Sequence, residues 1–224
     1  MNRNILLAVS AAALMGTLRA ESPFNIQINL GQAPILGEEG TKQVRVEVKT
    51  KIAETDLEGR LKAIVAKLNA DLNALLATRN KEIVSYRTRL FDHFETMLKQ
   101  SQASGDLEAY EKWKAQKNVF QKLRTFDDWA QVLSSGYYYG GNGEVFYAHV
   151  NNIQGISAPD FEKLYSDSIK EAYQAADKAE EEVQRDALKQ GNIKAATFIR
   201  EWRQKTLPRG EQINTARIIH GRKE

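Results

Sequence analysis

Apolar side chains recur with a helical period between residues 57 and 97. Steps of 4, 4 and 3 residues land on eleven apolar or aromatic side chains and one arginine. The series is Leu57, Leu61, Ile64, Leu68, Leu72, Leu75, Arg79, Ile83, Tyr86, Leu90, Phe94 and Met97. The mean step of about 3.6 residues is the period of an α-helix. The pattern predicts a helix of about 40 residues, roughly 60 Å long, which is longer than a compact domain of this size needs.

Alternation with a period of two marks two shorter segments, residues 24–30 and residues 44–48. β-Branched residues in this pattern predict half-buried strands. Val145 to Val150 is a third strand candidate and Ile213 to Ile219 a weaker fourth. We expect these strands to form a small sheet at the base of the helical rod. The alternative is an extended N-terminal segment without a sheet.

Glycine followed by a capping residue occurs twice, 86 residues apart. Gly105-Asp106 ends the long helix, and Gly191-Asn192 ends a helix that starts near Pro159. Glycine suits the left-handed position that closes a helix, and Asp or Asn caps the next one. A basic, tryptophan-containing helix follows each turn. The sequence therefore predicts two helical hairpins of related design, for which duplication and chance both remain open.

The helices between these turns have their own signals. We expect Leu107 and four aromatic or aliphatic residues after it to pack on the rod: Tyr110, Trp113, Phe120 and Leu123. Thr125 with Asp128 predicts a cap before a short helix over Phe126 to Leu133. The helix after Pro159 has an apolar stripe at Phe161, Tyr165, Ile169, Ala172, Ala176, Ala179, Val183 and Ala187.

The predicted fold is mainly α, with long antiparallel, coiled-coil-like helical hairpins and a small β element at the base. The chain divides into a signal peptide (1–20), N-terminal β-strands and a loop (21–56), a first helical hairpin (57–135), a loop with a candidate strand (136–157), a second helical hairpin (158–206) and a basic tail (207–224).

The first twenty residues have the pattern of a secretory signal. Arg3 precedes an apolar run from Ile5 to Met15, and Ala20 is the natural residue before the cleavage site. We therefore expect an exported protein, periplasmic or extracellular, that begins at Glu21. No later stretch reaches 18 apolar residues, so the sequence predicts no transmembrane segment after cleavage. Without cysteine, the chain has no lipoprotein anchor, disulfide or thiolate zinc site.

Removal of the predicted signal almost cancels the net charge. The whole chain has 32 basic and 29 acidic residues; without Arg3 and Arg19 the balance is 30 to 29. This balance argues against nucleic acid as a partner. The C-terminal region is basic, and its candidate anion contacts are Arg209, Arg217, Arg222 and Lys223. They could bind anionic lipid, teichoic or lipopolysaccharide phosphates or nucleic acid, or could be an ordinary solvated terminus.

Reactive constellations are not apparent, so we expect no catalytic residue, cofactor or metal site. His93, His149 and His220 lack metal-ligand spacing, and we expect His93 to be a surface histidine. Glu180-Glu-Glu182 is predicted to be the solvated side of a helix.

Aromatic residues cluster near a glycine-rich turn and are candidate ligand contacts: Tyr137, Tyr138, Tyr139, Phe146 and Tyr147. Such side chains stack on sugar rings or line peptide grooves. The alternative is that they fill the joint between the sheet and the hairpins.

The turn sequence Gly105-Asp106-Leu107-Glu-Ala109 and its counterpart at Gly191 carry a resemblance. Long helices with Gly-Asp-Leu-x-Ala turns resemble uncharacterised exported bacterial helical-hairpin proteins, over residues 86–120 and 173–206. The resemblance implies an extracytoplasmic helical protein and no known activity. In layout, a small β base with long helical arms also resembles the Skp/OmpH family of periplasmic chaperones.

Together these patterns favour a non-catalytic cell-envelope protein that uses a helical rod to bind a protein partner or itself. The apolar stripe of the rod is longer than one short return helix can cover, which favours a homo-oligomer or a bound partner. Alternatives are a periplasmic holdase chaperone of the Skp/OmpH type, binding of a glycan or wall polymer through the tyrosine-rich loop, and a hydrolase with unassigned carboxylates.

Overall fold

The computed structural model describes residues 57–139, 145–147, 153 and 155–222, and this part of the chain is mainly α. The described elements are α2 (Leu57–Ser104), α3 (Leu107–Gln121), α4 (Phe126–Ser135), β1 (Tyr137–Tyr139), β2 (Val145–Tyr147), α5 (Phe161–Lys189) and α6 (Ile193–His220). The predicted signal peptide and the strand candidates at 24–30 and 44–48 lie outside the described residues.

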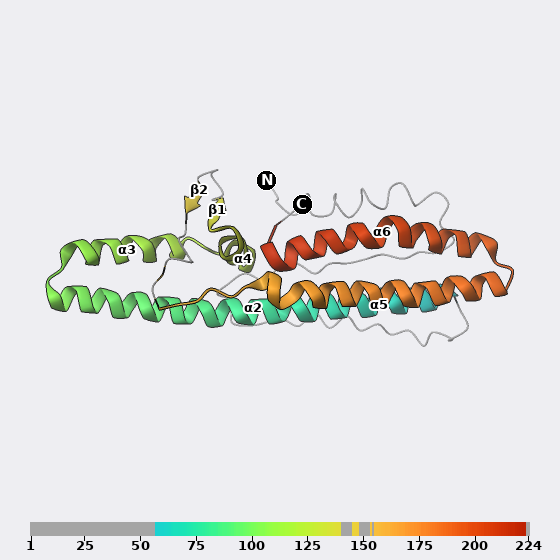
Figure 1. Cartoon of the computed structure of the whole chain (residues 1–224), viewed down its shortest axis with the longest axis horizontal. Coiled ribbons are helices and arrows are strands. Elements are labelled where there is room, and N and C mark those ends of the chain that lie inside the picture. The colour runs from blue at the N-terminus through green and yellow to red at the C-terminus, as the bar shows by residue number, and fades with distance from the viewer. Residues whose placement is uncertain (1–56, 140–144, 148–152, 154, 223–224) are drawn as a thin grey trace, which may run out of the picture.

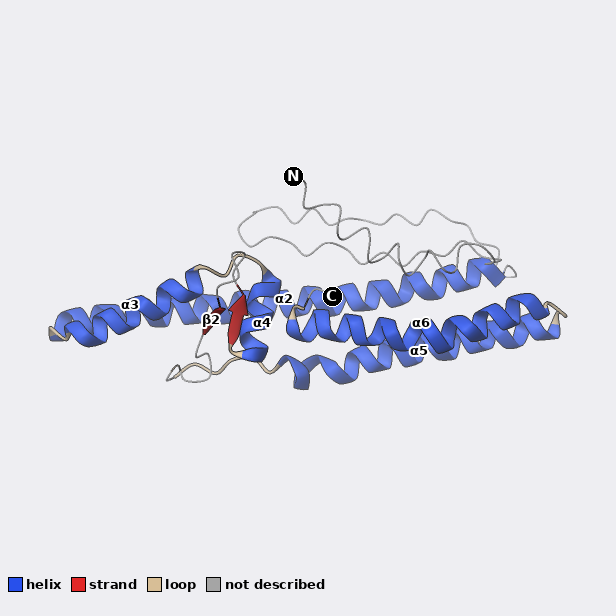
Figure 2. Ribbon diagram, turned by 90° about the horizontal axis from the view of Figure 1, so that it is seen from above, coloured by secondary structure: helices blue, strands red, loops and turns tan. Residues whose placement is uncertain are grey.

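Helix α2 extends along most of the described rod, and the other helices pack beside it (Figure 1; Figure 2). Its 48 residues span about 70 Å at 1.5 Å per residue. Helix α3 runs back along the C-terminal half of α2, whereas α5 and α6 lie along the N-terminal half. The two hairpins, α2–α3 and α5–α6, therefore point in opposite directions from the middle of the rod.

The short helix α4 lies at the middle of the rod, against the C-terminal end of α6 (Figure 1). It leads through Gly136, which has a φ of 75°, into an antiparallel pair of three-residue strands. Tyr137 pairs with Tyr147, Tyr138 with Phe146 and Tyr139 with Val145. The larger sheet predicted at the base of the rod is not shown.

The strand predicted at Ile213–Ile219 is wrong, because these residues belong to α6. Asn214 and Ile218 are buried four residues apart, which is the spacing of a helix face rather than of a strand. Helix α6 continues through Pro208 to His220, so most of residues 207–224, predicted as a basic tail, is helical.

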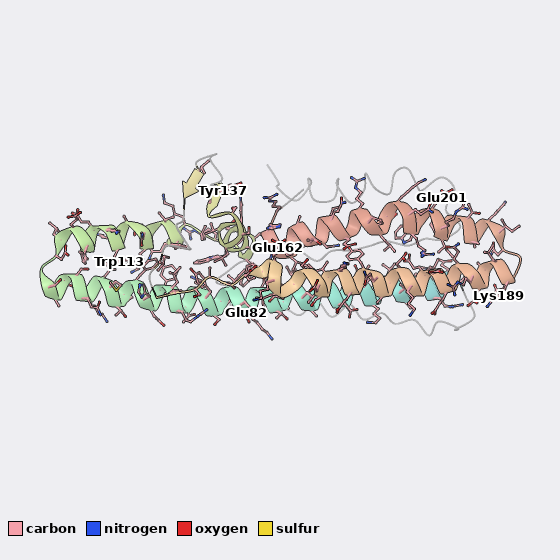
Figure 3. All side chains as sticks on the ribbon, viewed as in Figure 1. Glu82, Trp113, Tyr137, Glu162, Lys189 and Glu201 are labelled. Carbon is pink, nitrogen blue, oxygen red and sulfur yellow. The ribbon has the colours of Figure 1, made fainter. Side chains whose placement is uncertain are left out.

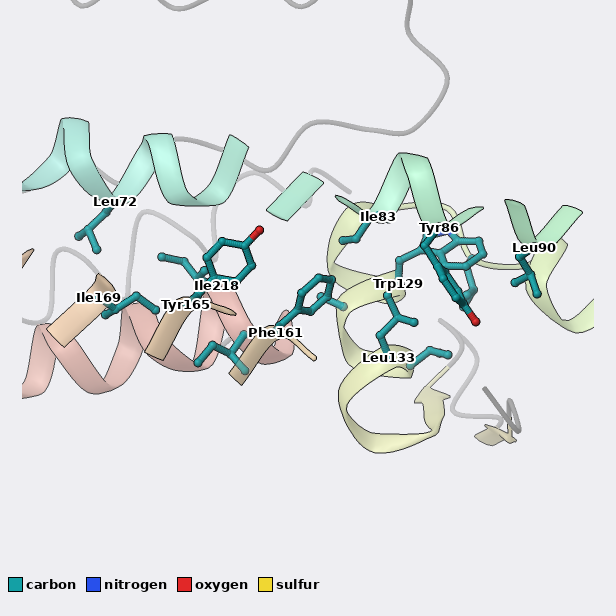
Figure 4. Close-up of a cluster of buried hydrophobic side chains, with 14 of the residues drawn as sticks. Leu72, Ile83, Tyr86, Leu90, Trp129, Leu133, Phe161, Tyr165, Ile169 and Ile218 are labelled. Atoms are coloured by element: carbon teal, nitrogen blue, oxygen red, sulfur yellow. The ribbon is translucent and has the colours of Figure 1, made fainter. Parts of the chain in front are cut away.

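The predicted stripe of α2 faces the core, and neighbouring helices of the same chain cover it. The main cluster joins α2 to α4, α5 and α6 around Tyr86, Trp129 and Ile169 (Figure 4). A second cluster, at the far end of the α5–α6 hairpin, contains Leu61, Val183 and Ile199. As predicted, the short return helix α3 does not cover the whole stripe. Its N-terminal half is covered by α5 and α6 of the same chain, so the stripe length no longer favours an oligomer or a bound partner.

Turns and caps form where the sequence predicts them. Gly105 and Gly191 both have a φ of 72°. The carboxylate of Asp106 accepts a hydrogen bond from the Ala109 N–H at 3.0 Å, and Asn192 accepts one from the Ala195 N–H at 3.1 Å. The two hairpin turns thus share one local geometry. Thr125 and Asp128 form the predicted capping box of α4.

Candidate functional site

Arg79, the one polar residue on the α2 stripe, is completely buried at the middle of the rod. Its guanidinium lies 3.1 Å from a carboxylate oxygen of Asp127 in the first turn of α4. It also donates to Asn80 Oδ1 at 2.8 Å and to the carbonyl of Arg217 at 2.8 Å. Burial lowers the pKa of Arg79, and the adjacent Asp127 opposes that change. The arginine that interrupts the apolar stripe therefore connects α2 with α4 and α6.

The C-terminal end of α6 is fixed at the same place. Gly221, with a φ of 62°, ends the helix, and a Cβ at this position would lie 2.3 Å from the carbonyl oxygen of Asp127. The guanidinium of Arg79 satisfies carbonyls in the last turn of α6, which an arginine does well because it has five donors. This joint therefore fixes the end of α6 against the first turn of α4 and against α2.

Glu180 is a buried charged group outside this joint, and the prediction that it faces solvent is wrong. Its exposed fraction is 1%, because it lies on the core face of α5 between Ala176 and Val183. Ala176 belongs to the main cluster and Val183 to the second, so the carboxyl group separates the two apolar clusters. Glu182, by contrast, is exposed as expected.

The surroundings of Glu180 favour its protonated form. Its Oε1 accepts a hydrogen bond from the Trp202 indole N–H at 3.2 Å, and its Oε2 has no partner among the described residues. Burial raises the pKa of Glu180 to about 7; the Trp202 hydrogen bond opposes this rise, and Asp177 adds to it. A catalytic role does not follow, because a side chain 1% exposed cannot reach a substrate.

Next to Glu180, Arg203 connects α6 to α5. Its guanidinium binds both carboxylate oxygens of Asp177, at 2.8 and 3.1 Å, and donates to Gln184 at 3.0 Å. The fork matches carboxylate geometry, so Arg203 holds the hairpin together. Arg203 and Asp177 also line a shallow open groove between α5 and α6, together with Tyr173 and Pro208.

The five aromatic candidates are brought together by the β1–β2 hairpin beside α4. Tyr137 is half-buried, and its carbonyl accepts a hydrogen bond from Ser135 Oγ at 3.1 Å. The register places Tyr138 opposite Phe146 and Tyr137 opposite Tyr147. The side chains of Tyr138, Tyr139, Phe146 and Tyr147 lie outside the described part of the structure, so ligand binding here stays a prediction.

The basic candidates do not form a separate tail. Arg209 is exposed on α6, and Arg217 is half-buried in its last turns, where its carbonyl accepts a hydrogen bond from Arg79. Arg222 is exposed just after the helix, whereas Lys223 lies outside the described residues. Burial and then Arg222 lower the pKa of the nearby His220.

His93 is half-buried rather than on the surface, because it packs edge-on to Trp113 with ring centroids 5.6 Å apart. Trp113 lies on α3 (Figure 3). Among the described residues, no three His, Asp or Glu side chains are arranged to hold a metal ion. None of the helices that the structure describes is long and apolar enough to cross a membrane.

The ends of the two hairpins expose aliphatic side chains that sequence reasoning did not assign to solvent. Leu107, expected to pack on the rod, is 67% exposed, and its counterpart Ile193 is 68% exposed. Leu188 at the second end is 53% exposed. Each of the first two residues directly follows a helix cap, so its side chain points away from the packed face. The sequence contains a signal for these exposed residues, because an aliphatic residue directly follows the capping residue in both turns.

Charge distinguishes these ends although their turns share one geometry. The acidic end, residues 101–111, contains Asp106, Glu108 and Glu111 and no basic residue. The basic end, residues 187–197, contains Lys189 and Lys194 and no acidic residue. Figure 3 shows Lys189 at the end of the rod opposite to the α2–α3 turn. The rod therefore presents an acidic and a basic surface, each with exposed aliphatic groups.

Comparisons of the chain with known protein families, with curated proteins and with solved structures find no match.

Proposed function

We propose that this chain is a non-catalytic, exported interaction protein of the cell envelope: a rod that binds a protein partner or a second copy through its hairpin ends. The supporting observation is the exposure of aliphatic side chains at both ends of a rod whose interior is filled by its own helices. Leu107 and Ile193 are both about two-thirds exposed, whereas the core face of α2 is covered. Leu107 and Ile193 are the most exposed of the large apolar side chains in the described residues, which favours the ends as the places where other molecules bind.

The joint at the middle of the rod supports a function in which the rod keeps its two hairpin ends apart. The buried Arg79–Asp127 pair joins α2 to α4 and, through the α6 carbonyls, to the second hairpin. Because α2 is continuous through this joint, the two ends stay about 70 Å apart. The holdase alternative has less support, since the hairpins point in opposite directions instead of rising together from one base (Figure 1).

Photo-crosslinking in the cells that make the protein tests this proposal. A photoreactive amino acid replaces Leu107 in one variant and Val84 in another. Val84 is an exposed aliphatic residue, 45% exposed, midway along α2. We expect a protein adduct from position 107 and none from position 84. An adduct of twice the chain mass indicates a second copy. Adducts from position 84 alone, or from neither position, would contradict the proposal.

Glycan or wall-polymer binding is a second candidate, because β1 and β2 place five aromatic residues on two paired strands. Replacement of Tyr138 and Tyr139 by alanine is expected to abolish retention on a polysaccharide array while helicity is unchanged. Unchanged retention of the variant would contradict this candidate.

A further inference from the structure

The basic end has the composition of a surface that contacts lipid. Leu188 and Ile193 are 53% and 68% exposed on either side of the α5–α6 turn. Lys189 follows the first and Lys194 follows the second, so each aliphatic group has an ammonium group next to it. Apolar side chains surrounded by lysines favour an interface between water and anionic lipid, because the apolar groups enter the acyl boundary while the ammonium groups stay at the phosphates.

Neighbouring charges do not cancel the two lysines. Arg60 of α2 lies 2.7 Å from Asp186, and Lys62 lies 2.6 Å from Glu58. Asp186 is thus paired with Arg60 at short range. Lys189 forms a longer ion pair with the same carboxylate, at 3.5 Å, and its side chain is still 78% exposed. Among the described residues of this turn, 187–197, the exposed charged and large apolar side chains are therefore basic and aliphatic.

We propose that the basic end docks on the surface of an anionic phospholipid bilayer, with Leu188 and Ile193 in the interface and Lys189 and Lys194 at the headgroup phosphates. This inference rests on the proposed use of the hairpin ends as contact sites, and it goes beyond the proposed protein partner by assigning a lipid surface to the basic end. A bilayer fits this end better than the same end of a second copy, because two basic surfaces repel each other, whereas an anionic bilayer attracts the lysines and accepts single aliphatic side chains.

The acidic end serves as a control for the effect of charge on lipid binding. It has the same glycine φ of 72° and the same cap hydrogen bond, and it exposes Leu107 to the same extent. Its three carboxylates are repelled by an anionic surface. If exposed aliphatic groups alone caused lipid binding, both ends would bind; if charge complementarity is needed, only the basic end binds.

An environment-sensitive dye on a single cysteine distinguishes the two ends in the full chain, which has no native cysteine. Gln190→Cys and Ser104→Cys place the dye at equivalent exposed positions, one residue before Gly191 and Gly105. The local readout also separates the hairpin ends from any binding by residues 1–56. Vesicles of phosphatidylcholine with about one-third phosphatidylglycerol are titrated against each labelled chain, and vesicles of phosphatidylcholine alone are the comparison.

We expect a blue shift from the dye at position 190 with the anionic vesicles only, and no shift from position 104. The added pair Ile193→Ser and Leu188→Ser is expected to raise the half-saturating lipid concentration at least tenfold. The pair Lys189→Gln and Lys194→Gln is expected to do the same. Because these side chains are exposed, circular dichroism of each variant should match the parent.

Several results would overturn the inference. They are no shift at position 190, equal shifts at both positions, or an equal shift with uncharged vesicles. A shift at position 190 that depends on protein concentration without vesicles would identify a second copy as the occupant. A protein adduct from position 107 together with an unresponsive dye at position 190 would overturn the lipid inference and leave the proposed function standing.

Discussion

The guanidinium of Arg79 lies 3.1 Å from the carboxylate of Asp127, and both side chains are buried at the centre of the rod. The two residues belong to different helices and are 48 positions apart in the chain. Arg79 also donates to the carbonyl of Arg217 at 2.8 Å, which adds the end of α6 to the same contact. One ion pair thus holds together the point from which the hairpins extend in opposite directions.

Replacement of Arg79 by methionine is expected to lower the free energy of unfolding by about 3–5 kcal/mol, because it leaves the carboxylate of Asp127 buried without its partner. Urea unfolding followed by circular dichroism measures this loss. Lys81→Met, two residues further along α2 and exposed, is the control and should stay within about 0.5 kcal/mol of the parent. Equal effects of the two substitutions would contradict a structural role for the ion pair.

Asp127→Asn in the Arg79→Met background tests whether the two residues act as a pair. Once the cation is absent, removal of the carboxylate charge should recover part of the lost stability, so the effects of the two substitutions should not add. A coupling free energy of at least about 1 kcal/mol in the double-mutant cycle is expected. Strict additivity would show that Asp127 is stabilised by other groups.

Gly221→Ala and Gly191→Ala separate steric contact from backbone conformation. Both glycines have left-handed φ values, 62° and 72°, so each alanine costs about 1–2 kcal/mol in backbone strain. At position 191 a Cβ meets nothing within 4 Å, but at position 221 it lies 2.3 Å from the Asp127 carbonyl oxygen. We expect Gly221→Ala to destabilise the protein at least twice as much as Gly191→Ala in thermal unfolding. Similar losses would mean that α6 does not end against α4.

Glu180 makes the stability depend on pH. Folding raises its pKa from 4.5 to about 7, so the folded state binds the proton more tightly than the unfolded state. Its favourable contribution is therefore complete below pH 4.5 and is lost as the pH rises to about 7. This pKa change corresponds to about 3 kcal/mol. Glu180→Gln keeps the side chain neutral, so its stability relative to the parent should increase by about that amount between pH 4.5 and 8.

Urea unfolding of Glu180→Gln and of the parent at several pH values measures this difference. Glu182→Gln is the matched control, because Glu182 is exposed two residues further along α5 and should show no such trend. A difference between Glu180→Gln and the parent that is the same at pH 5 and pH 8 would contradict a protonated, buried Glu180.

Sequence periodicity predicted most of the helices and the turns between them, because apolar spacing and caps are local properties. The stripes of α2 and α5 and the turns at Gly105 and Gly191 are confirmed. The continuation of α6 was missed because Pro208, Gly210 and the isoleucines at 213, 218 and 219 favour a break or a strand locally. Packing against α4 and α5 overrides these preferences.

The roles of the buried charged residues and the directions of the hairpins could not be predicted from local sequence patterns. Arg79 fell on the apolar face, but its partners Asp127 and Arg217 are distant in the chain. Glu180 lies among three consecutive glutamates, and only the rotation of α5 determines which of them is buried. The opposite directions of the hairpins depend on tertiary contacts that no local pattern contains.

The distance between the hairpin ends is the most direct test of the rod and of the function proposed for it. Single-molecule energy transfer between dyes on Ser104→Cys and Gln190→Cys measures it in solution, in a chain with no other cysteine. Helix α2 alone separates these positions by about 70 Å, so low transfer efficiency and one narrow population are expected. A mean distance below about 50 Å, which would require α2 to bend or the hairpins to lie side by side, would contradict an extended rod with two separate contact sites.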